Sequence, residues 1–353
     1  MRQQKKPLLL VILATLILVC PTTLIASSDQ ATVDRDFSIL LTDLEVRAGV
    51  TLDIHARVFV NEQHPCESKT ILAVHGWDTT AATWGTLVEA LFEHNPAGQK
   101  VCQVVALDLP GRGGSSLPDG LDFGELTLDD YVSAILASLD RLRELHFRPQ
   151  TVIGHSMGGL LWQMVQQVLV DQGTDLRKQY KIKNAILLAS AGPAGVPWFV
   201  EGSWDPSLVF CDASPVGCYY YFPPEFWPWS HFFSMVTFAP VPGAPTAAEI
   251  VMNGWHSIEP EMATRQLFGS GLARPFVESG IFGPDCKTTL NVIVFEADAN
   301  ILPYEQEILY EYLTGDSDFE NFIVVPGGSA VHMLHMTNPG YLLETISGIV
   351  AVP

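Results

Sequence analysis

Positive charge is scarce in this sequence. Nineteen lysines and arginines stand against 39 aspartates and glutamates, which gives a net charge of −20. A surface of this sign repels nucleic acids and anionic membranes, so neither is expected as a partner. Charged residues are only 16% of the chain and hydrophobic residues are 48%, a composition typical of a packed core rather than of disorder. The 353 residues suffice for one large domain with an insertion.

Several chemical motifs are missing as well. The six cysteines include no CxxC pair and no zinc-ligand spacing, so no metal centre is expected. The glycine-rich stretch 108–116 has neither the spacing of a dinucleotide-binding motif nor the Gly-Lys-Ser/Thr of a phosphate loop. We therefore expect no cofactor and interpret this stretch as a turn that shapes the mouth of a site.

The N-terminus lacks the run of about 20 apolar residues that a membrane-spanning helix needs. Three basic residues precede a shorter apolar run from Pro7 to Cys20, and polar residues begin at Ser27. This pattern is typical of a secretory signal peptide. We expect residues 1–26 to be removed, which would leave a secreted or periplasmic protein without a stable membrane span. A retained N-terminal membrane anchor is the alternative.

Export would expose five remaining cysteines to an oxidising compartment, where disulfides form. Cys211 and Cys218 are close together in an irregular segment and are the first pairing that we predict. Cys66 and Cys102 each precede a predicted strand and could pair if those strands are neighbours. Cys286 is then left over.

Short apolar runs alternate with longer amphipathic stretches along most of the chain. We predict strands at 37–46, 51–60, 70–74, 103–107, 151–153, 182–189, 290–295 and 322–325. We predict helices at 83–94, 128–145, 157–170 and 304–312, and a last one from 340. The rhythm predicts an α/β fold with a mostly parallel eight-stranded sheet and helices on both faces, beginning with a hairpin.

The alternation breaks between 192 and 286, where prolines and aromatic residues are dense. Prolines at this density exclude long helices and central strands. We therefore predict a cap or lid insertion over 192–286, on a core formed by 27–191 and 287–353.

The segment Gly154-His155-Ser156-Met157-Gly158 matches the pattern G-x-S-x-G. It follows a predicted strand and precedes a predicted helix, which is the placement of a nucleophile elbow. A serine hydroxyl is a poor nucleophile at neutral pH and needs a base within hydrogen-bond reach. We predict that Ser156 is that nucleophile; a glycine-rich turn without chemistry is the alternative.

Two histidines near the C-terminus, His332 and His335, are candidates for the base. Asp298 follows the strand at 290–295, at the sheet edge where open α/β sheets place their sites, and Glu296 is the rival carboxylate. The carboxylate would fix the tautomer of the histidine. The order Ser156, Asp298, His332 is the one expected for a nucleophile elbow in such a sheet.

An oxyanion formed at Ser156 would need preorganised N–H donors. Met157 supplies one main-chain N–H at the start of the helix that follows the serine. Trp77, in the loop after the strand at 70–74, is the candidate for the second.

Four segments together resemble the α/β-hydrolase superfamily, in the branch of single-domain abhydrolase-1 enzymes. They are the loop His75-Gly76-Trp77, the turn Asp108-Leu109-Pro110-Gly111-Arg112-Gly113, the elbow 154–159 and the tail from His332 to Asn338-Pro339. The resemblance implies the α/β-hydrolase fold over about 37–190 and 287–351. It also favours His332 over His335, because the catalytic histidine of that branch commonly lies six residues before an Asn-Pro pair.

The chain departs from the family pattern at two places. Phe295-Glu296-Ala297-Asp298 replaces the usual Gly-x-x-Asp, which keeps Glu296 as an alternative, and no glycine directly precedes His332. The nucleophile position holds serine rather than aspartate, which argues against dehalogenase and epoxide-hydrolase relatives.

The resemblance and the aromatic-rich insertion predict an esterase or lipase-like serine hydrolase for small apolar esters, acting through an acyl-enzyme. The same three residues could instead open a lactone, cleave a carbon–carbon bond or support perhydrolysis without a cofactor. A non-catalytic binding scaffold is the alternative from a different class.

Overall fold

The computed structural model describes residues 35–61, 69–76, 79–94, 101–117, 126–193, 277–296, 298, 301, 303–326 and 332–351. The chain divides into two units, Met1–Val33 and Asp34–Pro353, and the fold is that of the second. The predicted signal peptide at 1–26 and the predicted cap, apart from 192–193 and 277–286, lie outside the described residues. Both stay predictions.

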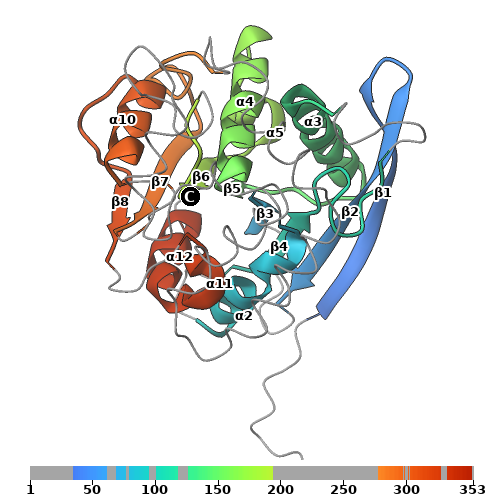
Figure 1. Ribbon diagram of the computed structural model, residues 1–353, viewed down its shortest axis with the longest axis horizontal. Helices are drawn as coiled ribbons and strands as arrows, with labels where there is room; N and C mark the ends of the chain where they lie inside the picture. Colours follow the sequence, from blue (N-terminus) through green and yellow to red (C-terminus); the bar gives the residue numbers. More distant parts are fainter. Residues whose placement is uncertain are drawn as a thin grey trace, which may run out of the picture. The chain divides into compact units, whose positions relative to one another are not determined.

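Eight strands form one sheet in the order β1-β2-β4-β3-β5-β6-β7-β8 (Figure 1). They are β1 Arg35–Arg47, β2 Val50–Val60, β3 Thr70–Val74, β4 Gln103–Leu107, β5 Thr151–His155, β6 Asn184–Leu188, β7 Thr289–Phe295 and β8 Phe322–Val325. β2 pairs antiparallel with both β1 and β4, and the other neighbouring pairs are parallel. The predicted N-terminal hairpin and mostly parallel sheet are confirmed.

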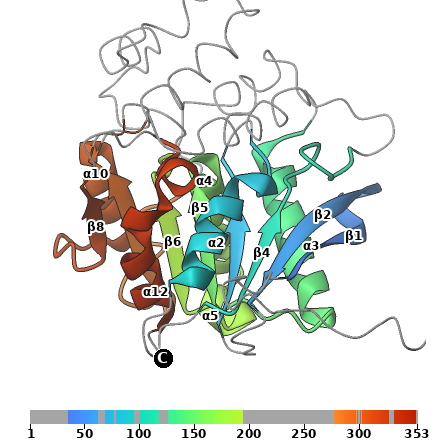
Figure 2. The same cartoon turned by 90° about the horizontal axis from the view of Figure 1, so that it is seen from below.

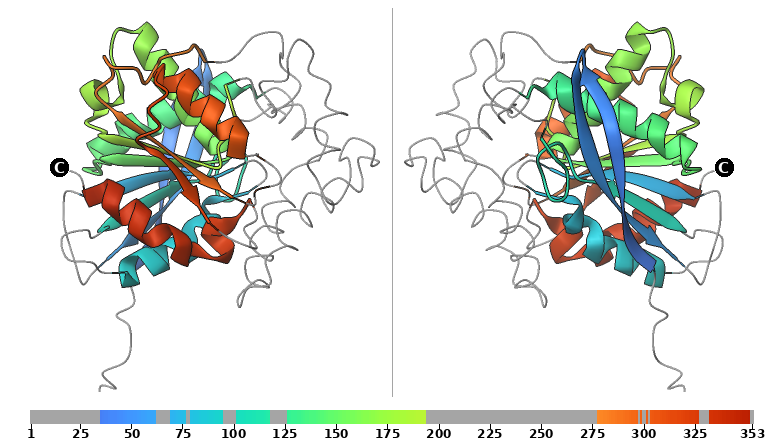
Figure 3. Two further views of the ribbon diagram at one scale, coloured as in Figure 1. Left: turned by 90° about the vertical axis from the view of Figure 1, so that its left-hand side faces the viewer. Right: turned by 90° about the vertical axis from the view of Figure 1, so that its right-hand side faces the viewer.

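Helices cover both faces of the sheet (Figures 1, 2 and 3). One face carries the 3₁₀ turns η1 Ala81–Trp84 and η5 Pro339–Leu342 with the helices α2 Gly85–Glu93, α11 Leu334–Thr337 and α12 Leu343–Ala351. The other carries α3 Leu128–Glu144, α4 Met157–Asp171, α5 Leu176–Tyr180 and α10 Pro303–Thr314. The sequence predicted the longer helices to within a few residues but not α5, whose five residues are too few to show a helical period.

The strands are apolar throughout because they bury side chains on both faces. Successive residues of a strand point to opposite sides. In β3, Leu72 and Val74 belong to the core that includes α3 and α4, whereas Ile71 and Ala73 belong to the core that includes α2 and α12. All four are at most 2% exposed, which explains the continuous apolar run of this strand.

Residues 277–286, which we assigned to the insertion, contribute to the core. Val277, Ile281 and Phe282 are buried in the same cluster as α3 and α4. The Tyr312 hydroxyl in α10 donates a hydrogen bond to the Val277 carbonyl at 2.9 Å.

No helix in the described ranges is long and apolar enough to cross a membrane.

The cysteine expectations are tested only in part. Cys102 is disulfide-bonded, and its partner lies outside the described residues. Cys286 is a free thiol, as expected for the cysteine left over. The pairings Cys66–Cys102 and Cys211–Cys218 stay predictions.

The site-forming edge lies where β3 and β5 are neighbours. The chain leaves β3 towards η1 and α2 on one face, and it leaves β5 towards α4 on the other face. The loops after β3 and β5 therefore diverge at the carboxyl edge of the sheet, where open α/β sheets form ligand crevices. His75 and Ser156 directly follow these two strands.

A row of buried rings fills the α2 side of this edge. Ring centroids are 4.9 Å apart for Trp84 and His335, 4.3 Å for His335 and His155, and 4.5 Å for His155 and His332. Neither ring nitrogen of His335 has a hydrogen-bond partner in the described part of the chain. Burial, with a smaller contribution from His332, lowers the pKa of His335 to about 3, so the ring is neutral at physiological pH.

We expect His335→Phe to flatten the acid side of the stability curve. The imidazole of the unfolded chain binds a proton below its ordinary pKa of 6.5, whereas the buried ring stays neutral down to about 3. Unfolding therefore takes up a proton in this window, and the ring lowers the unfolding free energy as the pH falls from 6.5. Urea titrations at several pH values in this window give the unfolding free energy of each protein. The slope of that free energy against pH should be smaller by about 1.4 kcal/mol per pH unit in the variant. An unchanged slope would contradict a neutral His335.

Candidate active site

Ser156 occupies a strained turn between β5 and α4. Its φ of 53° and ψ of −118° lie in a region that costs a residue other than glycine about 1–3 kcal/mol. Hydrogen bonds hold the turn: Ser156 N donates to the Leu188 carbonyl at 3.1 Å, and Ala191 N donates to the Ser156 carbonyl at 3.0 Å. The Ser156 hydroxyl makes no capping hydrogen bond to α4, so it is not committed to the helix.

Gly158 lets the first turn of α4 press against the end of β3. A Cβ atom here would collide with the carbonyl oxygens of Val74 and His75, so no larger residue fits without displacing β3. The contact places the N-terminus of α4 beside the loop after β3. Met157 is the first helical residue, and its N–H has no acceptor within the helix, which leaves it available to an anion. Trp77 lies outside the described residues.

His332 and Asp298 form a buried pair. His332 Nδ1 lies 2.9 Å from Asp298 Oδ2, and the two residues are 2% and 3% exposed. Asp298 Oδ1 accepts a second hydrogen bond from Ile301 N at 3.1 Å. Because a carboxylate only accepts, Nδ1 of the neutral imidazole carries the proton and Nε2 keeps its lone pair.

The geometry separates the rival residues. Glu296 is exposed, whereas Asp298, two residues on, points inward to His332. His335 packs against the ring of His155, at a centroid distance of 4.3 Å. Of the sequence candidates, only Asp298 and His332 are joined by a hydrogen bond in the described ranges.

His332 reaches the elbow through its main chain. His155 Nε2 donates to the His332 carbonyl at 2.8 Å, and His155 directly precedes Ser156. Among the described residues, no hydrogen bond joins the Ser156 hydroxyl to the His332 ring. Catalytic hydrogen bonds are often long in a ligand-free enzyme and tighten only with substrate, so a base role stays open to His332.

Asp108 organises the turn after β4. Its carboxylate accepts hydrogen bonds from Ala81 N at 2.6 Å and Gly114 N at 3.0 Å, and it lies 2.7 Å from His55 Nδ1. One buried side chain thus joins the turn to β2 and to η1. The glycine-rich stretch predicted to shape the mouth of a site lies at the carboxyl end of β4, beside the loop after β3.

His75 ties that loop to the same turn. Its Nε2 accepts a hydrogen bond from Leu109 N at 3.0 Å, and its Nδ1 donates to the Gly76 carbonyl at 2.7 Å. Burial lowers the pKa of His75 to about 4, which keeps the ring neutral and able to accept. These two hydrogen bonds of the buried His75 ring therefore fix the main chain at His75 and Gly76, directly before Trp77.

Two buried glutamines support the elbow and were not predicted. Gln306 of α10 accepts from Ser190 N at 3.1 Å and donates to the Ser190 carbonyl at 2.7 Å. Gln163 of α4 donates to the Ala191 carbonyl at 2.8 Å. The sequence shows only that a glutamine lies within each predicted helix, and this does not identify its partner.

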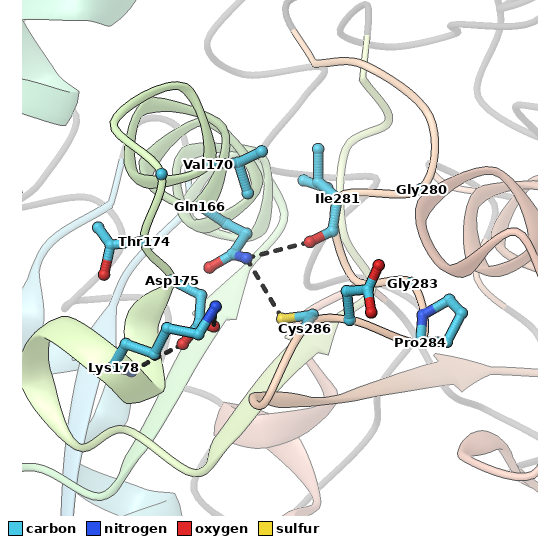
Figure 4. Close-up of a pocket in the computed structure, with 12 residues that line it drawn as sticks. Gln166, Val170, Thr174, Asp175, Lys178, Gly280, Ile281, Gly283, Pro284 and Cys286 are labelled. Carbon is cyan, nitrogen blue, oxygen red and sulfur yellow. Dashed lines mark hydrogen bonds and ion pairs between the residues drawn. The ribbon is translucent and has the colours of Figure 1, made fainter.

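A pocket of about 280 Å³ opens at the opposite edge of the sheet (Figure 4). Its lining comes from the C-terminal half of α4, from α5 and from the turns before β7, and includes Gln166, Lys178 and Cys286. Ser156, Asp298 and His332 are not part of it. Burial raises the pKa of the Cys286 thiol, which makes it a weaker nucleophile at neutral pH.

Comparison with known proteins identifies the family. The model of the alpha/beta hydrolase family matches residues 71–345, well over half of the chain. A serine hydrolase-like protein from Danio rerio is 33% identical over 96 residues, which are 27% of this chain. The match spans only 26% of the length of that relative.

Similar solved structures agree on the fold. An esterase from Thermogutta terrifontis has a TM-score of 0.59 at 17% identity, covering 88% of this chain and 97% of its own. An enol-lactonase from Burkholderia xenovorans has a TM-score of 0.57 at 16% identity, covering 85% and 97%. At such identities the likeness establishes the α/β-hydrolase fold alone. Together with the family match, it shows that this chain belongs to the alpha/beta hydrolase family.

Proposed function

We propose that this protein is a serine hydrolase that cleaves small carboxylic esters, with Ser156 as nucleophile, His332 as base and Asp298 as the carboxylate that orients the base. The observation that carries the proposal is the buried 2.9 Å hydrogen bond between His332 Nδ1 and Asp298 Oδ2. It supports a histidine whose Nε2 is free to take a proton, on a loop bonded to the residue before a strained serine.

The proposed reaction has two halves. Ser156 Oγ attacks the ester carbonyl while its proton passes to His332 Nε2, and the proton then goes to the departing alkoxide. Water attacks the resulting acyl-enzyme with help from the same nitrogen and releases the acid. Main-chain N–H groups of Met157 and Trp77 would stabilise the tetrahedral oxyanion in both halves.

An apolar substrate is the finer part of the proposal. The support is compositional: the insertion at 192–286 is rich in tryptophan, tyrosine and phenylalanine, and aromatic surfaces favour hydrophobic ligands. A lactone is a second candidate, because the same nucleophilic attack opens a cyclic ester and one similar structure is that of an enol-lactonase.

Ser156→Ala should remove the nucleophile and lower kcat/KM for p-nitrophenyl butyrate by about 10⁴-fold or more. A fluorophosphonate probe should label the wild-type protein at Ser156, as mapped by peptide mass spectrometry, and should not label the variant. The exposed Ser317 supplies the matched control, and Ser317→Ala should be labelled like the wild type. A wild-type protein that resists the probe would argue for the non-catalytic scaffold.

Asp298→Asn should lower kcat by about 10³- to 10⁴-fold, because the amide can present a donor to Nδ1 and favour the wrong tautomer of His332. Glu296→Gln removes a neighbouring carboxylate that is exposed, and should leave kcat within about threefold of wild type. Steady-state kinetics on both variants measures the contrast. A larger loss in Glu296→Gln would reassign the carboxylate.

Ester chain length should govern specificity. Each methylene of the acyl group that enters an apolar site contributes about 0.8 kcal/mol, so kcat/KM should rise by about fourfold per methylene from acetate to hexanoate. A series of p-nitrophenyl esters, run beside an aliphatic lactone of matched carbon number, measures this. A flat series would reject the apolar site, and faster turnover of the lactone would favour the lactonase.

A further inference from the structure

We infer that His155 is a positioning residue for the proposed base: its hydrogen bond to the main chain of His332 sets the distance between the base and the nucleophile. The inference rests on the proposed function and extends it to a residue that performs no chemistry itself. His155 is the last residue of β5 and immediately precedes Ser156.

The contact that carries the inference is short and buried. His155 Nε2 lies 2.8 Å from the His332 carbonyl oxygen, across 177 residues of sequence. A carbonyl oxygen only accepts, so Nε2 of His155 carries the proton and donates. His155 and His332 are 1% and 2% exposed, so water does not compete for this bond.

The second support is that His155 and Asp298 hold different parts of His332. Its side chain is bonded to Asp298, and that bond orients the ring. The bond from His155 acts on the backbone instead, and it comes from the residue covalently joined to Ser156. Because β5 is a central strand, this anchor is rigid.

The surroundings of His155 keep its ring in one place and one state. A Cβ atom on Gly76 would lie 2.8 Å from His155 Nδ1, so the loop after β3 closes one side of the ring. His335 closes another at a centroid distance of 4.3 Å. Burial, reinforced by the nearby histidines, holds the pKa of His155 well below its ordinary value, so the ring remains a neutral donor.

The test compares two replacements at this position. His155→Phe keeps a ring of similar size but removes the donor, and should lower kcat by about 10- to 100-fold with KM nearly unchanged, as expected for a displaced catalytic group. His155→Gln can place an amide Nε2 near the original nitrogen, and should recover kcat to within about fivefold of wild type. Folding of both is checked by circular dichroism.

His335→Phe is the matched control, because it replaces an equally buried histidine of the same ring row whose ring nitrogens have no hydrogen-bond partner among the described residues. It should leave kcat within about threefold of wild type. An equal loss in this variant would assign the effect to packing and overturn the inference. If His155→Phe does not fold, His155→Asn takes its place: its amide is too short to reach the carbonyl, so kcat should fall while His155→Gln recovers it.

Fluorophosphonate labelling separates this inference from the proposed function. A wild-type protein that is not labelled at Ser156 would reject the proposed function itself. Labelling of the wild type with equally fast labelling of His155→Phe would keep the function and reject the role of His155. Slow labelling of His155→Phe, restored in His155→Gln, supports both.

Discussion

The arrangement at the carboxyl edge of the sheet depends on one buried carboxylate. Asp298 is 3% exposed, and an ionised group removed from water costs several kcal/mol unless donors replace the lost hydration. Ile301 N and His332 Nδ1 are such donors. Satisfying the aspartate therefore decides the tautomer of the histidine, and the tautomer decides that Nε2 is the nitrogen able to accept a proton.

Strain at Ser156 is tolerated for a related reason. A serine with positive φ would relax if its neighbours allowed it, but its main chain is bonded on one side to β6 and on the other to the loop after β6. Gln306 and Gln163 hold that loop from two helices on the same face of the sheet. Hydrogen bonds from several elements thus hold the elbow in its strained conformation.

The buried rings link stability to the site. Desolvation keeps His335 and His155 neutral, so they carry no charge that would repel a protonated His332 during the proposed reaction. The same desolvation makes the fold sensitive to acid, because these rings bind protons once the chain unfolds. The same burial therefore suits the proposed reaction near neutral pH and lowers the unfolding free energy of the protein at acid pH.

Local pattern alone predicted most of the sheet. Strands buried on both faces appear as continuous apolar runs, as in β3 and β5, and the run into Gly154 followed by a helical stretch identified the elbow at Ser156. These features depend on the burial and backbone geometry of single residues, and the residue types of the same short segment are enough to predict both. The helix α5 was not predicted, because five residues form too few turns to show a helical period in the sequence.

The amino-acid sequence by itself determined the eight strands, the long helices and the turn that presents Ser156. Only the tertiary structure decided that Asp298 rather than Glu296 faces His332, and that His155 holds the His332 backbone from 177 residues away. The physical reason is that a short segment encodes which side chains prefer burial and which turns the backbone tolerates. The partner of a buried polar atom is set by how distant segments pack, and no local pattern records it.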